Sequence, residues 1–210
     1  VSGESSRDAS YHLTLLAQNR TGFNNLIQLA SRAFLEGFYH KPRIDRELLS
    51  AHREGIVCLS GCVSGEFART LLSGNSAEDA IAKGQEIAAW FSRVFGDRYF
   101  IEIQNNGLEV QRQALELSVE VAKRMGLPTV ATCDAHYVRQ EDAVAQDVLL
   151  CINTGKFRTD TNRMRMEGDQ FYLRSPQEMY TTFAGLEDAV ANAAVEINTD
   201  PDDDARPHKL

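Results

Sequence analysis

The stretch that decides the fold is PTVATCDAH, at residues 128–136. Its first part, residues 128–132, is an apolar, β-branched run typical of a buried strand. Asp134 and His136 follow two residues apart, so we expect their side chains on the same side of an extended backbone. Carboxylate and imidazole are both ligands of divalent metals, and α/β barrels build their active sites at the carboxyl ends of strands. The stretch therefore predicts a metal site at a strand end.

Three similar units precede this stretch. Apolar periodicity predicts strands over 11–17, 56–60 and 99–103 and helices over 21–35, 64–73, 76–94 and 109–124. Strand–helix alternation at this spacing predicts parallel βα units. Because a closed barrel of this type needs eight strands, we expect an α/β fold with a partial barrel of about four parallel strands.

The chain changes character after Gly155. A helix is predicted over 141–153, followed by irregular polar chain over 156–170 and a short strand over 171–173. A further helix is predicted to begin at Ser175-Pro176, with Glu178 in a capping box. A last helix is predicted over 186–197. We therefore divide the chain into a flexible lead-in (1–10), a partial barrel (11–155), a helical segment leading toward further domains (156–197) and a disordered tail (198–210).

Composition restricts the function classes. Apolar runs fall short of the roughly 20 residues of a membrane span, and four cysteines without CxxC spacing favour a reduced compartment, so we expect a cytoplasmic protein with no membrane partner. The net charge of −8 argues against a general nucleic-acid clamp. Basic residues cluster in one part of the sequence: Lys156, Arg158, Arg163, Arg165 and Arg174. This cluster is explained equally well by a solvated loop and by a phosphate-binding site.

Polar residues at the other strands complete the candidate site. His12 opens the first strand, Cys62 follows the second and Glu102 lies within the third. His and Cys, like Asp134 and His136, are ligands for metals of the zinc or manganese type. Each also has a structural alternative: His12 as a core histidine, Cys62 as a small buried apolar residue, and Glu102 as a cap for a neighbouring backbone group. Cys58 and Cys133 are assigned to packing.

Five segments together resemble one family. They are YHLTLLA (11–17), TGFNNL (21–26), LSGC (59–62), RYFIEIQ (98–104) and VATCDAHYV (130–138). In order and spacing they are similar to the PHP (polymerase and histidinol phosphatase) domain of the bacterial replicative DNA polymerase III alpha subunits, over residues 10–197. The resemblance implies a seven-stranded βα barrel with a cluster of up to three metals and a 3′–5′ exonuclease. It aligns His12, Cys62, Asp134 and His136 with metal ligands, the ions being zinc, manganese or magnesium.

The resemblance is incomplete at both ends. The family's upstream ligands, beginning with an H-x-H motif, and its downstream polymerase regions are not in this sequence. We therefore interpret the chain as the carboxyl part of the PHP domain of such a subunit, a DNA-directed DNA polymerase (nucleotidyltransferase) of DNA replication. The partners implied are DNA, a proofreading exonuclease and a sliding clamp, and the fragment alone is expected to be inactive. The alternatives are a stand-alone PHP metal-dependent phosphoesterase and a non-catalytic PHP docking module.

Overall fold

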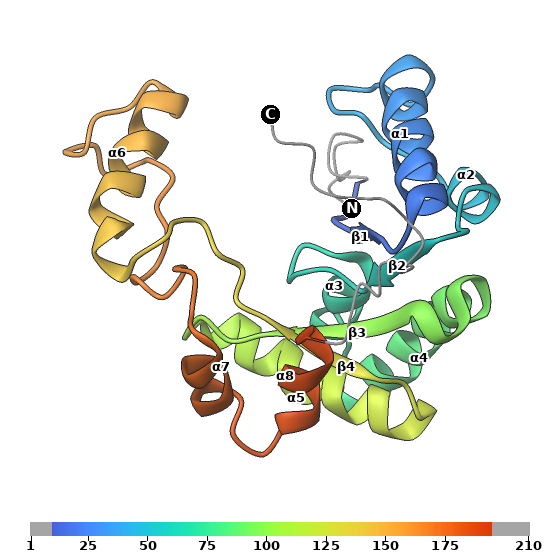
Figure 1. Ribbon diagram of the computed structural model, residues 1–210. Helices are drawn as coiled ribbons and strands as arrows, with labels where there is room; N and C mark the ends of the chain where they lie inside the picture. The colour runs from blue at the N-terminus through green and yellow to red at the C-terminus, as the bar shows by residue number, and fades with distance from the viewer. Residues whose placement is uncertain (1–9, 195–210) are drawn as a thin grey trace.

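A four-stranded sheet with helices packed around it forms the centre of the molecule (Figure 1). The computed structural model describes residues 10–194, so the predicted tail and all but the last residue of the predicted lead-in lie outside the described residues. The strands pair in chain order: β1 (Thr14–Ala17), β2 (Ile56–Leu59), β3 (Tyr99–Gln104) and β4 (Thr129–Thr132). The α/β class and the four strands are confirmed.

The first strand runs against the others. β2, β3 and β4 are parallel, but β1 is antiparallel to β2, with Thr14 opposite Leu59 and Ala17 opposite Ile56. The prediction of four parallel strands is therefore wrong at β1. The reason lies in the connection, because the chain runs out along α1 (Arg20–Leu35) and returns through α2 (Arg46–Ala51) to the end where β1 finished. The sequence reading did not predict α2, which is too short to show a helical period.

A close backbone contact brings the two ends of this connection together. Gly22, in the first turn of α1, touches Gly55, which directly precedes β2. A Cβ atom built on Gly22 would lie 1.7 Å from the carbonyl oxygen of Gly55, so only glycine permits this approach. The antiparallel pairing of β1 and β2 begins from this contact.

The main core lies between the sheet and the helices α3 (Glu66–Leu72), α4 (Ala77–Phe95) and α5 (Glu109–Met125). These helices agree with the predicted spans, and α5 ends at Gly126 in the left-handed conformation. A 3-10 turn, η2 (Gly96–Arg98), leads from α4 into β3. Side chains at the centre of this core are fully buried: Ile56, Phe67, Leu71, Tyr99, Ile101 and Val121.

The last part of the segment after β4 covers the outer edge of the sheet, through α7 (Pro176–Thr182) and α8 (Glu187–Ala194). The segment begins with η3 (Gln140–Asp142) and α6 (Ala143–Thr154). The side-chain amide of Asn192 on α8 donates to the Thr129 carbonyl of β4 at 2.9 Å, so the free edge of β4 is shielded. A second core joins α7 and α8 to β3 and β4: Ile103, Ala131, Met179, Phe183, Ala189 and Val190.

The predictions for this segment hold in part. The capping box at the start of α7 is confirmed, because Ser175 and Glu178 bond each other's backbone amides. The predicted strand at 171–173 is wrong, because a single bridge between Tyr137 and Tyr172 takes its place. The last helix begins at Glu187, and positions 195–197 of its predicted span lie outside the described residues. No helix within residues 10–194 is long and apolar enough to cross a membrane.

Candidate metal centre

The candidate ligands lie at one edge of the sheet. The carboxyl ends of β2, β3 and β4 meet there, because these strands are parallel. β1 is antiparallel, so its first residue, Thr14, lies beside the last residue of β2, Leu59. His12, two residues before β1, consequently sits beside the carboxyl end of β2. A parallel β1 would have placed His12 at the opposite edge.

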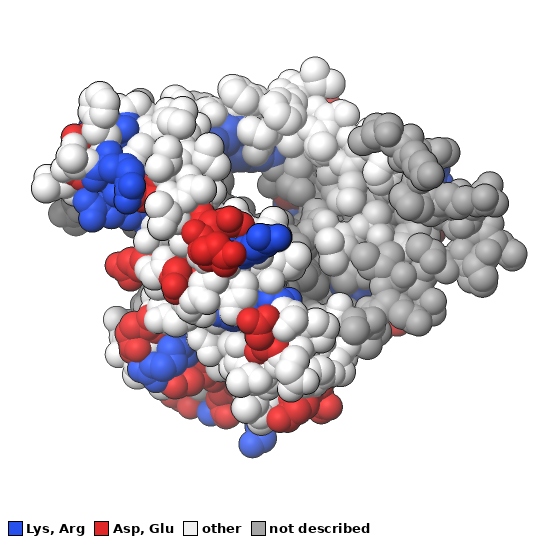
Figure 2. Space-filling view, turned by 60° about the vertical axis from the view of Figure 1, so that its left-hand side comes forward, with Lys and Arg blue, Asp and Glu red and all other residues white. Residues whose placement is uncertain are grey.

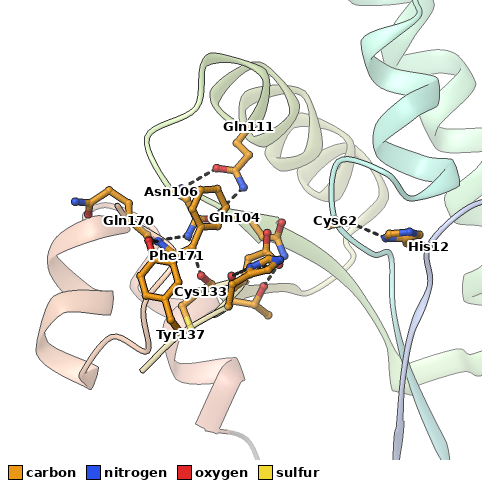
Figure 3. Close-up of polar contacts among 12 residues, drawn as sticks. His12, Cys62, Gln104, Asn106, Gln111, Cys133, Tyr137, Gln170 and Phe171 are labelled. Carbon is orange, nitrogen blue, oxygen red and sulfur yellow. Dashed lines mark hydrogen bonds and ion pairs between the residues drawn. The ribbon is translucent and has the colours of Figure 1, made fainter. Parts of the chain in front are cut away.

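His12 and Cys62 are in contact (Figure 3). The distance between His12 Nδ1 and Cys62 Sγ is 3.5 Å. The loop that carries Cys62 is bound to the backbone of His12, whose amide donates to the Ser64 carbonyl at 3.1 Å. A histidine nitrogen and a cysteine sulfur that bind the same tetrahedral zinc ion lie about 3.6 Å from each other. The pair therefore has the spacing of adjacent ligands, as well as that of a thiol–imidazole hydrogen bond.

Gly61 permits this contact. Its φ of 87° is in the region that favours glycine, and a Cβ atom there would lie 2.7 Å from the His12 carbonyl oxygen. His12 is exposed and Cys62 is half-buried, so neither is the core residue of the structural alternative. Cys58 is fully buried and packs in the core as predicted, and burial, followed by the charge of Glu102, raises the pKa of its thiol well above the usual range.

Asp134 and His136 are brought together by a turn. Asp134 has a φ of 47°, so the expectation that an extended backbone aligns the two side chains is wrong. His136 Nδ1 lies 2.7 Å from the Asp134 carbonyl oxygen and 4.0 Å from its carboxylate Oδ1. The His136 amide also donates to the Phe171 carbonyl at 2.7 Å. With Nδ1 donating to a carbonyl, Nε2 is the nitrogen left to bind a ligand.

Three of the four candidate metal ligands line an open cavity of about 660 Å³. Its lining includes His12, Cys62 and Asp134, whereas His136 is not among the lining residues. Across residues 10–194, no three His, Cys, Asp or Glu side chains are close enough together to hold one metal ion. The structure thus brings the candidates together as two pairs, and neither pair is a complete metal site.

A buried carboxylate lies at the same cavity. Glu102 is 8% exposed, and its oxygens accept from the Thr14 hydroxyl (3.3 Å), the Gln104 side-chain amide (3.1 Å) and the Thr132 hydroxyl (2.7 Å). It therefore bonds side chains, and the structural alternative of a backbone cap is wrong. All three partners are neutral donors, so none of them supplies a counter-charge to the carboxylate.

This carboxylate has no cationic partner in the part of the chain that the structure describes, where no ion pair involves Glu102. A buried charge without a counter-charge is costly, so a cation in the cavity would stabilise it. Gln104 Oε1, also buried at this cavity, has no hydrogen-bond partner among the described residues. The donor chemistry of the two pairs, together with this charge and this acceptor, fits a divalent cation.

Asn106 anchors the strand ends beneath the site (Figure 3). Its side-chain amide donates to the carbonyls of Cys133 and Gln170, both at 2.8 Å. Gln111 on α5 bonds both its backbone amide, at 2.8 Å, and its side-chain oxygen, at 3.0 Å. The Asn106 side chain is 2% exposed and holds Cys133, the residue that directly precedes Asp134.

Comparison with known proteins places the chain in a family. The model of the PHP domain matches residues 2–106, which is half of the chain. The chain belongs to the PHP domain family. It is 46% identical over 183 residues to the DNA polymerase III subunit alpha of Treponema pallidum (strain Nichols), covering 87% of this chain and 15% of that protein.

Other relatives carry the same name. Identity is 42% over 183 residues with the DNA polymerase III subunit alpha of Borreliella burgdorferi (87% of this chain, 16% of that protein). Identity is 46% over 169 residues with the DNA polymerase III subunit alpha of Thermus aquaticus (80% of this chain, 13% of that protein). This PHP chain thus spans about 15% of the length of these relatives. PHP domains are typically metal-dependent, which agrees with the donor chemistry of the cavity.

The sequence reading missed the polar residues around Glu102 in this PHP domain. Thr14, Gln104 and Thr132 were not singled out, and neither was Asn106. A signal was present in β3, where Glu102 and Gln104 alternate with buried Ile101 and Ile103. Polar residues two apart in a buried strand share one face, and that face must meet other polar groups.

Replacing Asn106 with alanine should destabilise the domain. Asn106→Ala removes three side-chain hydrogen bonds and leaves two partly buried carbonyls without this donor, so we expect the free energy of unfolding to fall by about 2–4 kcal/mol. Urea denaturation followed by circular dichroism measures this. The adjacent Asn105→Ala, whose side chain bonds one loop amide, should cost about 1 kcal/mol or less. Equal losses of stability in the two variants would contradict the anchoring role.

Proposed function

We propose that this chain is part of a replicative DNA polymerase alpha subunit and that its PHP cavity binds divalent metal ions. The single observation that carries the metal proposal is the contact of His12 with Cys62 on the cavity that also holds Asp134 and the unpaired charge of Glu102. The names of the relatives support the polymerase context. In the whole subunit, which acts in the cytoplasm, the substrate is DNA, and the partners are a proofreading exonuclease and a sliding clamp.

The chain's own residues have separate roles in this proposal. His12 and Cys62 hold metal as one pair, and Asp134 and His136 as the other. Glu102 supplies negative charge from beneath, and Thr14 and Thr132 keep its oxygens in place. A bound zinc, manganese or magnesium ion lowers the pKa of water and polarises a phosphodiester, which is the chemistry of a 3′–5′ exonuclease.

A non-catalytic docking module is the second candidate. The observation that favours it is the absence, within residues 10–194, of three metal-binding side chains in one group. Under this hypothesis the two pairs are structural, with Cys62 donating to His12 and His136 donating to the Asp134 carbonyl. Metal binding by the chain separates the two candidates, because the docking module does not need it.

Cobalt should bind through the thiolate of Cys62. Titration of the 210-residue chain with Co²⁺ should produce a thiolate-to-cobalt charge-transfer absorption, because Cys62 and His12 have ligand spacing. Cys62→Ser should abolish this absorption. Cys133→Ala is the matched control, since Cys133 is also half-buried and free, and it should leave the absorption unchanged. No absorption in the wild type would support the docking module instead, and its survival in Cys62→Ser would contradict the role of Cys62 as a ligand.

Neutralising Glu102 should weaken metal binding. Glu102→Gln keeps the shape of the side chain but removes the charge, so we expect the zinc affinity to fall about 10–100-fold, as for other residues that support metal ligands. Competition with a chromogenic chelator measures the affinity. Glu120→Gln, on the exposed face of α5, removes the same charge far from the cavity and should change the affinity little. An unchanged affinity in Glu102→Gln would rule out its role.

Asp134 should matter for metal content in the longer polymerase that contains this chain. Asp134→Asn removes a charge that helps to offset the cation, so metal content and PHP exonuclease activity should both fall at least about tenfold. DNA synthesis should fall less, because it occurs elsewhere. Elemental analysis beside both assays measures this, and the 210-residue chain alone should show neither activity. Unchanged metal content would mean that Asp134 and His136 are structural.

A further inference from the structure

A second cavity, of about 290 Å³, lies on an arm made of residues 140–170. The arm contains α6 and the irregular chain that follows it, and it stands apart from the sheet in Figure 1. One ion pair holds the two parts of the arm together. Arg163 bonds both carboxylate oxygens of Asp147 on α6, with Nη2 at 2.9 Å from Oδ2. The Arg163 side chain is only 5% exposed.

The cavity contains more positive charge than this ion pair requires. Arg158 and Arg165 also line it, and Asp147 is the one carboxylate among its lining residues. Arg158 Nε lies 3.4 Å from Asp147 Oδ2, and Arg165 donates to the backbone carbonyl of Asp160 at 3.1 Å. The hydrogen bond from Arg163, with the charges of all three arginines, lowers the pKa of Asp147. Figure 2 shows the basic side chains gathered on the arm, at the upper left.

Arg163 also has a donor that the folded chain does not use. Its Nε is buried and has no hydrogen-bond partner among the residues that the structure describes. A buried donor without an acceptor is unfavourable, so an oxygen anion that reached Arg163 Nε would gain a hydrogen bond that the described residues do not provide. Guanidinium groups suit tetrahedral phosphate oxygens because they offer several donors in a fixed plane.

We propose that the arginine pocket, formed by Arg158, Arg163 and Arg165, binds a backbone phosphate of single-stranded nucleic acid. Two aromatic side chains favour this ligand over an acidic peptide. Phe157, beside Arg158 in the chain, is 76% exposed, and Tyr137 lines the cavity itself. Bases stack on aromatic rings next to a basic groove without regard to sequence. The proposal is independent of the metal centre, since no candidate metal ligand lines this cavity.

The test measures binding of a fluorescein-labelled oligo(dT) of about 12 nucleotides to the full 210-residue chain by anisotropy. In Arg158→Gln/Arg165→Gln, which keeps the Arg163–Asp147 ion pair, the affinity should fall about tenfold at about 50 mM salt. The slope of log affinity against log salt should become shallower by about 0.7 for each phosphate that the variant no longer neutralises.

The matched control is Arg32→Gln/Arg112→Gln. It removes the same charge from exposed positions on α1 and α5, and the affinity should change less than about twofold. Asp147→Asn provides a test in the opposite direction, because removing the carboxylate while keeping an acceptor for Arg163 should tighten binding. In the nitrogen–proton NMR spectrum, the Arg163 Nε–H signal should shift on titration with inorganic pyrophosphate.

Several results would overturn the proposal. They are undetectable binding by the wild type, an equal fall in affinity in the pocket variant and the control variant, or an Arg163 Nε–H signal that does not respond to pyrophosphate. Poly-glutamate that displaces oligo(dT) at equal charge concentration would show that the pocket takes acidic peptides, which would also overturn the assignment to nucleic acid.

Discussion

The antiparallel pairing of β1 with β2 is the constraint on which the rest of the site depends. It turns the start of β1 toward the edge where the three parallel strands end, and so brings His12 to Cys62. The pairing relies on two glycines with different tasks. Gly22 lets the start of α1 approach the chain before β2, and Gly61 lets the Cys62 loop lie on the His12 backbone. Backbone packing therefore positions the imidazole and the thiol next to each other.

Beneath these residues the sheet contains a charge that its own packing does not neutralise. Glu102 lies in a buried strand, and its neighbours supply hydrogen bonds but no positive charge. Hydrogen bonding and charge compensation are different requirements, and within residues 10–194 only the first is met at Glu102. A cation in the cavity would supply Glu102 with a counter-charge that the described residues do not provide.

Charge is distributed unevenly over the molecule. The chain as a whole has a net charge of −8, yet three arginines and one carboxylate line the cavity of the arm. Overall charge describes long-range attraction, whereas the binding of a phosphate depends on local donors. The arm's arginines and the candidate metal ligands line separate cavities. The Arg163–Asp147 ion pair holds the irregular chain on α6, and Arg158 and Arg165 line the same cavity.

Local sequence patterns determined most of the elements of this protein. The strands at 56–59, 99–104 and 129–132, the long helices and the capping box at Ser175 follow from apolar period and from side chains near in sequence. The tertiary structure alone decided the direction of β1, the turn at Asp134, the partners of Glu102 and the burial of Arg163. The physical reason is the separation along the chain between the residues that make each contact. Strand direction depends on the whole path between β1 and β2, and the partners of Glu102 come from strands up to 88 residues away. No local window of sequence contains those contacts, whereas the period of a strand or helix is complete within a few residues.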